Sequence, residues 1–297
     1  MLQKYAGFFV SLPLCITIGS RIVEQPNAAI AQTLESLPQN QASDCNPELV
    51  ECAHRGLTRF AWSAQPIPHL ISPRRTKILN PQPLIRWLPI AGASDYTVIL
   101  EGEGLSWQAQ TATTQLRYTG GMPLKPSGVY EVIIEADTGA SSEDEPIHPG
   151  GIAFEVLTSA EQEVIATQVE KLAGDTRAIA DLYLANRLVA EGIAQLEQLW
   201  QTAPSASLAL RLGNLYFEQL FLPTIAEEYY QQALEQELSL AQQAIALVKR
   251  GQVRAVMHDS AGAIDFWQQA QVIYSRLGNV NQVEALARWI EEEQEFL

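Results

Sequence analysis

The chain has 297 residues, of which 47% are hydrophobic and only 18% charged, so it can bury real cores and is not disordered overall. Its formal net charge is −15, which gives it no general electrostatic attraction for phosphate backbones or anionic lipid. We therefore expect no nucleic-acid partner, and the length allows one large domain or two ordinary ones.

The first 31 residues have the pattern of a signal peptide. Lys4 precedes an apolar run over residues 5–19, which is shorter than the roughly 20 residues needed to span a bilayer. Residues 29–31 read Ala-Ile-Ala, the small-x-small pattern that a signal peptidase cleaves. We predict an exported protein, periplasmic or extracellular, without membrane insertion after cleavage. Retention of residues 1–31 as an uncleaved anchor is the alternative.

Residues 32–75 form the expected lead-in segment, which is rich in Gln, Asn, Ser and Pro and shows no helical or strand period. Cys45 and Cys52 are the two cysteines left after signal cleavage. In an oxidising compartment we expect them to form a disulfide bond that closes a short loop. A metal pair is the alternative, but no second Cys or His pair stands at zinc spacing, so we expect no metal and no cofactor.

From Thr76 the pattern changes to short strands separated by Gly and Pro turns, over residues 76–157. Several short strands with frequent turn signals are typical of a β-sandwich. The six expected strands are residues 84–88, 96–100, 106–111, 116–118, 130–134 and 152–156.

One motif in this region resembles the fibronectin type III signature. Leu124-x-Pro126 precedes Tyr130, as in that family ahead of its penultimate strand. The resemblance implies that the Tyr130 hydroxyl bonds to the backbone a few residues upstream, with Leu124 packed inside. Trp87 and Tyr96 also fall where the family has its core Trp and the next strand's Tyr. We therefore expect an all-β Ig/fibronectin III-like sandwich, with an unrelated sandwich as the alternative.

Residues 158–297 are predicted to be entirely helical. Thr158 and Ser159 are followed three residues later by Glu161 and Gln162, which gives two overlapping capping boxes at a helix start. The remaining sequence is rich in Ala, Leu, Glu and Gln.

A repeated pattern of small and large residues runs through this helical part. A small residue on a first helix would meet a small residue on a second, and a large side chain one turn later would fill the groove beside them. The spacings are 12-4-3, 13-4-3 and 12-4-3 in the sets Ala180, Gly192, Leu196 and Leu199; Gly213, Ala226, Tyr230 and Ala233; and Gly251, Ala263, Trp267 and Ala270.

With Gly213-x-x-Tyr216 and Pro204, this pattern resembles the tetratricopeptide repeat. The resemblance implies an all-α array of helix pairs, and a generic helical bundle is the alternative. Two features depart from the family: one extra residue near Pro223, and Arg254 where an aromatic residue is usual. The repeats would cover residues 172–274, with capping helices at 159–172 and 280–296.

By the geometry of that family, the first helix of each pair lines a concave groove. The positions expected to line this groove include both apolar and polar side chains, which suits an extended peptide or a partner helix. Only Arg177 is basic and Asp181 opposes it, so a clamp for a terminal carboxylate is not expected. The groove positions are Arg177, Asp181, Leu184, Leu210, Asn214, Phe217, Val248, Gln252 and Ala255.

The sequence contains no recognisable catalytic motif: no glycine-rich phosphate loop, no Gly-x-Ser-x-Gly elbow and no Cys–His arrangement. His54, His69, His148 and His258 have no ligand or base partner at a recognisable spacing. The acidic residues 143–145 with His148 could hold a cation, or form an ordinary acidic surface loop. We predict that the protein is not an enzyme.

The function expected from these patterns is an extracytoplasmic interaction or scaffolding module that binds a protein or peptide in the groove. The combination is also similar to exported repeat proteins of cyanobacteria. The alternatives are an envelope hydrolase, with a site at the domain junction that uses His54, His69 or His148, and a self-associating structural protein of the envelope.

Overall fold

The computed structural model describes residues 66–145 and 151–297, all of which belong to the second of two units, Met1–Cys45 and Asn46–Leu297. The predicted signal peptide, the Cys45–Cys52 pair and most of the predicted lead-in lie outside the described residues. In the described ranges, none of the helices has the length and apolar character needed to cross a membrane.

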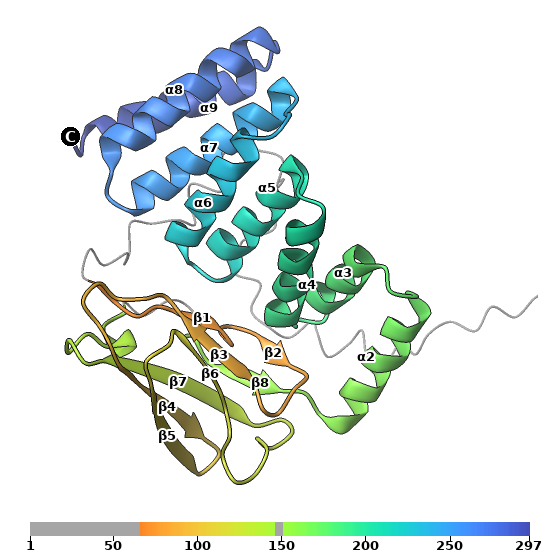
Figure 1. Cartoon of the computed structure of the whole chain (residues 1–297). Coiled ribbons are helices and arrows are strands. Elements are labelled where there is room, and N and C mark those ends of the chain that lie inside the picture. Colours follow the sequence, from red (N-terminus) through yellow and green to blue (C-terminus); the bar gives the residue numbers. More distant parts are fainter. Residues whose placement is uncertain (1–65, 146–150) are drawn as a thin grey trace, which may run out of the picture. The chain divides into compact units, whose positions relative to one another are not determined.

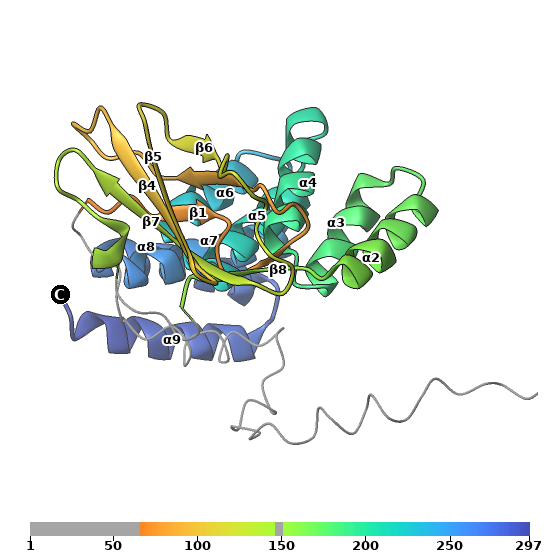
Figure 2. The same ribbon diagram turned by 90° about the horizontal axis from the view of Figure 1, so that it is seen from below.

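The β region forms two sheets (Figures 1 and 2). One has the strand order β1-β3-β6 and the other β2-β8-β7-β4-β5. Paired strands are antiparallel except β2 and β8, which are parallel. The strands are β1 (Leu70–Ser72), β2 (Lys77–Ile78), β3 (Leu84–Trp87), β4 (Tyr96–Gly102), β5 (Leu105–Thr111), β6 (Gln115–Arg117), β7 (Val129–Ala136) and β8 (Phe154–Val156).

All six predicted strands are present, with ends shifted by up to two residues, and two further strands were not predicted. β1 lies before residue 76, inside the predicted lead-in segment, which was expected to be loosely structured. β2 follows the predicted start and pairs with β8 at the other end of the β region. Strands of three and two residues are too short to show an alternating pattern, so the sequence did not reveal them.

The core of the β region lies between the inner faces of the two sheets, because alternate strand residues point to opposite faces. In β7, for example, Tyr130, Val132 and Ile134 are buried while their neighbours are more exposed. Trp87 of β3 is 2% exposed and packs edge-on against Tyr96, with the ring centroids 5.4 Å apart. Both rings therefore belong to the core.

The corner before β7 is closed by Tyr130. Its hydroxyl accepts a hydrogen bond from the backbone N–H of Lys125 at 2.9 Å, and Leu124 is buried. A Cβ added at Gly128 would lie 2.6 Å from the tyrosine ring, so glycine permits this close approach. The hydroxyl-to-backbone bond and the buried leucine are those that the fibronectin type III resemblance implied.

Eight helices and one π-helical segment follow in the described part (Figure 1). They are α2 (Ser159–Lys171), α3 (Thr176–Ala185), α4 (Val189–Thr202), α5 (Ala206–Asn214), the π-helical segment η2 (Leu215–Gln219), α6 (Pro223–Leu234), α7 (Leu240–Val256), α8 (Ser260–Arg276) and α9 (Val280–Gln294).

One capping box, not two, starts α2. Thr158 accepts a hydrogen bond from the N–H of Glu161, and the Glu161 carboxylate accepts bonds from Thr158 in return. These bonds lower the pKa of Glu161 to about 2. Gln162, expected in a second box, instead donates to the carbonyl of Leu157.

The small-to-large pattern of the sequence brings successive helices together as α3–α4, α5–α6 and α7–α8. A Cβ added at Gly213 would lie 2.5 Å from the Tyr230 ring, and one at Gly251 would lie 2.2 Å from Nε1 of Trp267. The large side chain that was expected to fill the groove therefore lies directly against the glycine of the first helix in both pairs. α9 covers α8, with the Trp267 and Trp289 rings 5.3 Å apart (Figure 2).

The extra residue near Pro223 has a structural counterpart in η2, which interrupts the first helix of the second pair. A π-helical turn takes up one additional residue without ending the helix. Phe221 then turns the chain with a left-handed φ of 54°, and Pro223 begins α6. His258 (φ 62°) makes the corresponding turn between α7 and α8.

Candidate functional site

The structure places most of the predicted groove positions inside the helical array. Phe217 is 1% exposed and Val248 4% exposed, and both pack in hydrophobic clusters between helices. Arg177 and Asp181 are exposed. The buried positions are Leu210, Phe217, Val248, Gln252 and Ala255, and Leu184 and Asn214 are half-buried.

This burial corrects the prediction that these side chains line an open groove. In the second and third helix pairs, five of the six predicted positions are buried against neighbouring helices, so they cannot serve as open anchors for a peptide, and Asn214 is half-buried. Asn214 accepts a hydrogen bond from the Tyr230 hydroxyl at 2.8 Å. On α3, Arg177 and Asp181 are exposed and Leu184 is half-buried.

Ion pairs link neighbouring first helices on their outward side. Arg211 of α5 pairs with Asp181 of α3, and Lys249 of α7 pairs with Glu218 of η2 at 2.6 Å. Arg211 and Lys249 stand 38 residues apart, as do Gly213 and Gly251, so they occupy equivalent places in the two repeats. The 38-residue spacing of these two cations was visible in the sequence, but their acidic partners were not.

Ile245, which is 41% exposed, precedes Lys249 by four residues on α7 and therefore shares its side of the helix. We call this set the first-helix face. It consists of Arg177, Asp181, Arg211, Glu218, Ile245 and Lys249, and combines both charge signs with one exposed apolar side chain.

A buried ionic cluster joins the β region to η2. The Arg74 side chain is fully buried and binds both carboxylate oxygens of Glu145, at 2.9 and 2.6 Å. Its Nε donates to the carbonyl of Leu220, at the end of η2, at 2.7 Å. His69 Nδ1 lies 3.3 Å from the same carboxylate. Glu145 is therefore not an exposed loop residue, and its carboxylate is not available to bind a metal ion because it is already paired with Arg74.

A second set of contacts joins the strand β2 region to the start of α4. The N–H of Lys77 donates to the carbonyl of Arg187, and the N–H of Leu79 donates to Glu191 Oε1 at 2.8 Å. The other carboxylate oxygen of Glu191 is buried and has no hydrogen-bond partner among the described residues. Burial raises the pKa of Glu191 to about 7.

The histidines do not converge on an open pocket in the described part of the chain. His69 is 3% exposed and held by Glu145, while His258 lies exposed in a helix turn. His54 and His148 lie outside the described residues. Within residues 66–145 and 151–297, no group of three His, Cys, Asp or Glu side chains is placed to hold a metal ion.

Comparison with known proteins gives little beyond these contacts. No protein-family model matches the sequence, and no curated protein matches it. Two crystal structures of MamA are similar to part of the chain. One is 18% identical and covers 44% of this chain and 86% of its own, with a TM-score of 0.32. The other is 16% identical and covers 45% and 80%, with a TM-score of 0.31. Similarity at this level does not identify a family. The assignment of the helix pairs therefore depends only on the contacts between the helices described above.

Proposed function

We propose that the protein is an interaction or scaffolding module, not an enzyme, and that it binds a protein or peptide partner through the first-helix face. The observation that carries the proposal is the pairing of Arg211 and Lys249, from equivalent repeat positions, with acids on the adjacent helix or segment. A stacked array that repeats its surface charges offers an extended, ordered surface.

The acidic side chains of this face are exposed, and their basic partners Arg211 and Lys249 are 31% and 15% exposed. Asp181 is 56% exposed in its pair with Arg211, and Glu218 is 45% exposed in its pair with Lys249. Exposed ion pairs contribute only about 0–1 kcal/mol to stability, so a partner can exchange the Arg211–Asp181 pair for its own charges at little cost. Lys249 is more covered, so a partner reaches that pair from the Glu218 side. Ile245 supplies an apolar contact beside them, and the partner is expected to present both charge signs.

The proposal includes a tetratricopeptide-type helical array, a fibronectin III-like sandwich and export of the protein. The Gly213–Tyr230 and Gly251–Trp267 contacts support a tetratricopeptide-type array. The two sheets and the Tyr130 hydroxyl bond support a fibronectin III-like sandwich, which would act as a spacer or second contact surface. The apolar run ending in Ala-Ile-Ala supports export, and with it the Cys45–Cys52 disulfide bond.

The test is affinity capture from envelope extract with the full chain as bait. Arg211→Glu with Lys249→Glu reverses both cations of the first-helix face. The matched control, Lys171→Glu with Arg276→Glu, makes the same charge change at exposed positions on α2 and α8. We expect a partner that the native chain and the control retain and the face variant loses, with the helical circular dichroism unchanged in all three.

Retention of the same partner by the face variant would remove the first-helix face from the proposal. Capture of the chain's own copies, with a concentration-dependent mass in sedimentation, would instead favour the self-associating structural protein.

A further inference from the structure

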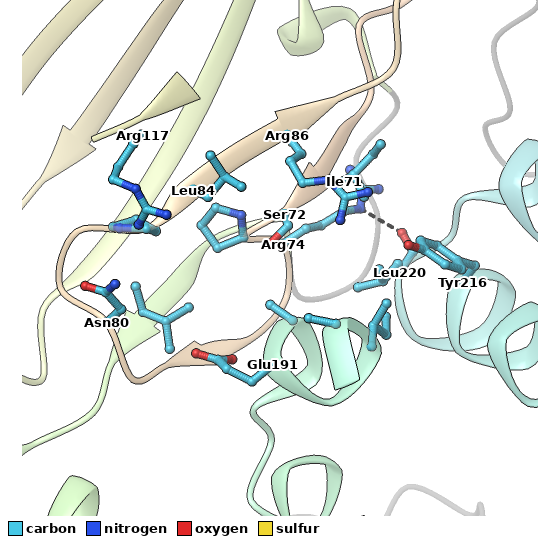
Figure 3. A pocket seen from close by; sticks show the side chains of 16 residues that line it. Ile71, Ser72, Arg74, Asn80, Leu84, Arg86, Arg117, Glu191, Tyr216 and Leu220 are labelled. Atoms are coloured by element: carbon cyan, nitrogen blue, oxygen red, sulfur yellow. Dashed lines mark hydrogen bonds between the residues drawn. The ribbon is translucent and has the colours of Figure 1, made fainter. Parts of the chain in front are cut away.

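A cavity of about 390 Å³ lies between the outer face of the three-stranded sheet and the helices α4 and η2. Its walls include Arg86 and Arg117 from strands β3 and β6, and Glu191 and Ile193 from α4. Figure 3 shows the two arginines on the strand side of the cavity and Glu191 on the helix side. The cavity is separate from the first-helix face.

The strand register explains why both arginines reach the cavity. Ile85 and Trp87 of β3 are buried between the sheets, so Leu84 and Arg86 point to the opposite, outer face. Leu84 pairs directly with Arg117 of β6, which places Arg117 on the same outer face and diagonally next to Arg86. Both arginine side chains thus lie on the outer face of the sheet and line the cavity, with Leu84 between them (Figure 3).

Hydrogen-bonding capacity remains on both arginines. Arg86 is 37% exposed and reaches Glu197 through one nitrogen at 3.2 Å. Arg117 is exposed and donates to the carbonyl of Gln82 at 3.0 Å. Each guanidinium carries five N–H donors, so each retains donors for a ligand. Because a guanidinium fork matches the geometry of a carboxylate, an anionic group of that kind is the natural acceptor.

The remaining lining is mainly apolar and carries little negative charge. Glu145 and Glu197, which pair with Arg74 and Arg86, are not part of the cavity wall. Of the described residues, only Glu191 adds an acidic side chain to the lining, and burial favours its neutral form. The apolar and small lining residues include Ile71, Ile78, Leu84, Ile193, Ala194 and Leu220.

We propose that this cavity binds a small molecule with an apolar body and one carboxylate, and that Arg86 and Arg117 hold the carboxylate. The apolar body would pack against the aliphatic side chains of β1, β3 and α4, which removes its surface from water. The site does not depend on partner binding at the first-helix face, since the two share no residue.

The test is isothermal titration calorimetry of the full chain with hexanoate, octanoate and benzoate as probes. 1-Octanol and 1-octylamine serve as controls, because they keep the apolar chain but carry no charge or the opposite charge. We expect at least one carboxylate to bind and both controls to bind at least about tenfold more weakly, the loss that follows from removing a charge-assisted hydrogen bond.

Two variants locate the site. Arg117→Gln removes the exposed guanidinium, and we expect it to weaken carboxylate binding about tenfold. Ala194→Phe adds a ring at an exposed position of α4 that lines the cavity, and we expect it to abolish binding without unfolding α4. Arg177→Gln, on α3 and outside the cavity, is the matched control and should bind like the native chain.

The proposal is overturned if none of the three carboxylates binds more tightly than the two controls. It is equally overturned if a carboxylate binds with the same Kd to the native chain and to both the Arg117→Gln and Ala194→Phe variants. Circular dichroism of each variant establishes that a loss of binding is not a loss of fold.

Discussion

The second and third helix pairs are built from the same pattern but differ in one place. Both set a glycine of the first helix against an aromatic ring of the second, Gly213 against Tyr230 and Gly251 against Trp267. In the third pair, α7 runs without interruption from Leu240 to Val256. In the second pair, α5 ends at Asn214 and the π-helical segment η2 follows.

The difference shows how a departure from a repeat can create an attachment point. The extra residue of η2 brings the Leu220 carbonyl to Arg74 of the β region, at 2.7 Å. Phe221, the next residue, lies under the guanidinium of Arg75 at 4.7 Å. The third pair has no such interruption in α7. The irregular pair therefore adds an attachment between the two parts of the described structure to the contacts made at α4, and the regular pair continues the array.

The largest effect is expected where this attachment is broken. Arg74→Met leaves the Glu145 carboxylate buried without its main cation, which costs about 3–5 kcal/mol for buried pairs of this kind. Equilibrium unfolding in urea measures the loss. We also expect the β region to unfold at lower denaturant concentration than the third helix pair.

A double variant distinguishes the cost of an unpaired buried charge from the loss of the attachment between the β region and η2. Arg74→Met with Glu145→Leu removes both charges and should recover much of the lost stability, because no buried charge is left unpaired. Equal stability of Arg74→Met and the native chain would show that the ionic cluster does not join the two parts.

A substitution in the third helix pair, α7 and α8, is expected to lower the stability less, and through overpacking instead of an unpaired charge. Gly251→Ala places a methyl group 2.2 Å from Trp267 Nε1, so the ring must move and its hydrogen bond to the Val248 carbonyl is strained. Overpacking of this kind costs about 1–3 kcal/mol, and thermal unfolding followed by Trp fluorescence measures it. Gly121→Ala, where nothing lies within 4 Å of the added Cβ, is the control and should be close to neutral.

Local patterns in the sequence predicted most of the fold. The six strands follow from patterns over a few residues, and the glycine-to-aromatic contacts follow from spacings of 17 and 16 residues between consecutive helices. β1 and β2 were missed because two or three residues carry no period, and their pairing with β3 and β8 is non-local. The cap at α2 was predicted correctly through Thr158 and Glu161, but the second box through Gln162 was wrong.

The candidate site was predicted less well, for a physical reason. Placing Phe217 and Val248 in a groove assumed that each first helix exposes the same positions to solvent. Burial, however, depends on how closely the neighbouring pair packs, and both side chains are covered by it. The bond between Arg74 and Glu145 spans 71 residues, so no local spacing could have shown it.

An effect no larger than that of Gly251→Ala, and dependent on pH, is expected at the contact between the β2 region and α4, where the Glu191 carboxylate is buried. Its pKa of about 7 exceeds the ordinary glutamate value of about 4.5, so the folded chain binds more protons than the unfolded chain between these two pH values. The free energy of unfolding should therefore fall as the pH rises from about 4.5 to 7 and level off above it.

Glu191→Gln removes the titrating group and keeps an oxygen for the N–H of Leu79. We expect the variant to be more stable than the native chain by about 1–3 kcal/mol at pH 8 and to match it near pH 4. Urea unfolding across this pH range gives the difference, with Glu228→Gln on the exposed side of α6 as the control for loss of charge. A difference that does not grow with pH would mean that Glu191 is ionised in the folded chain at little cost, and that the contact between β2 and α4 does not depend on pH.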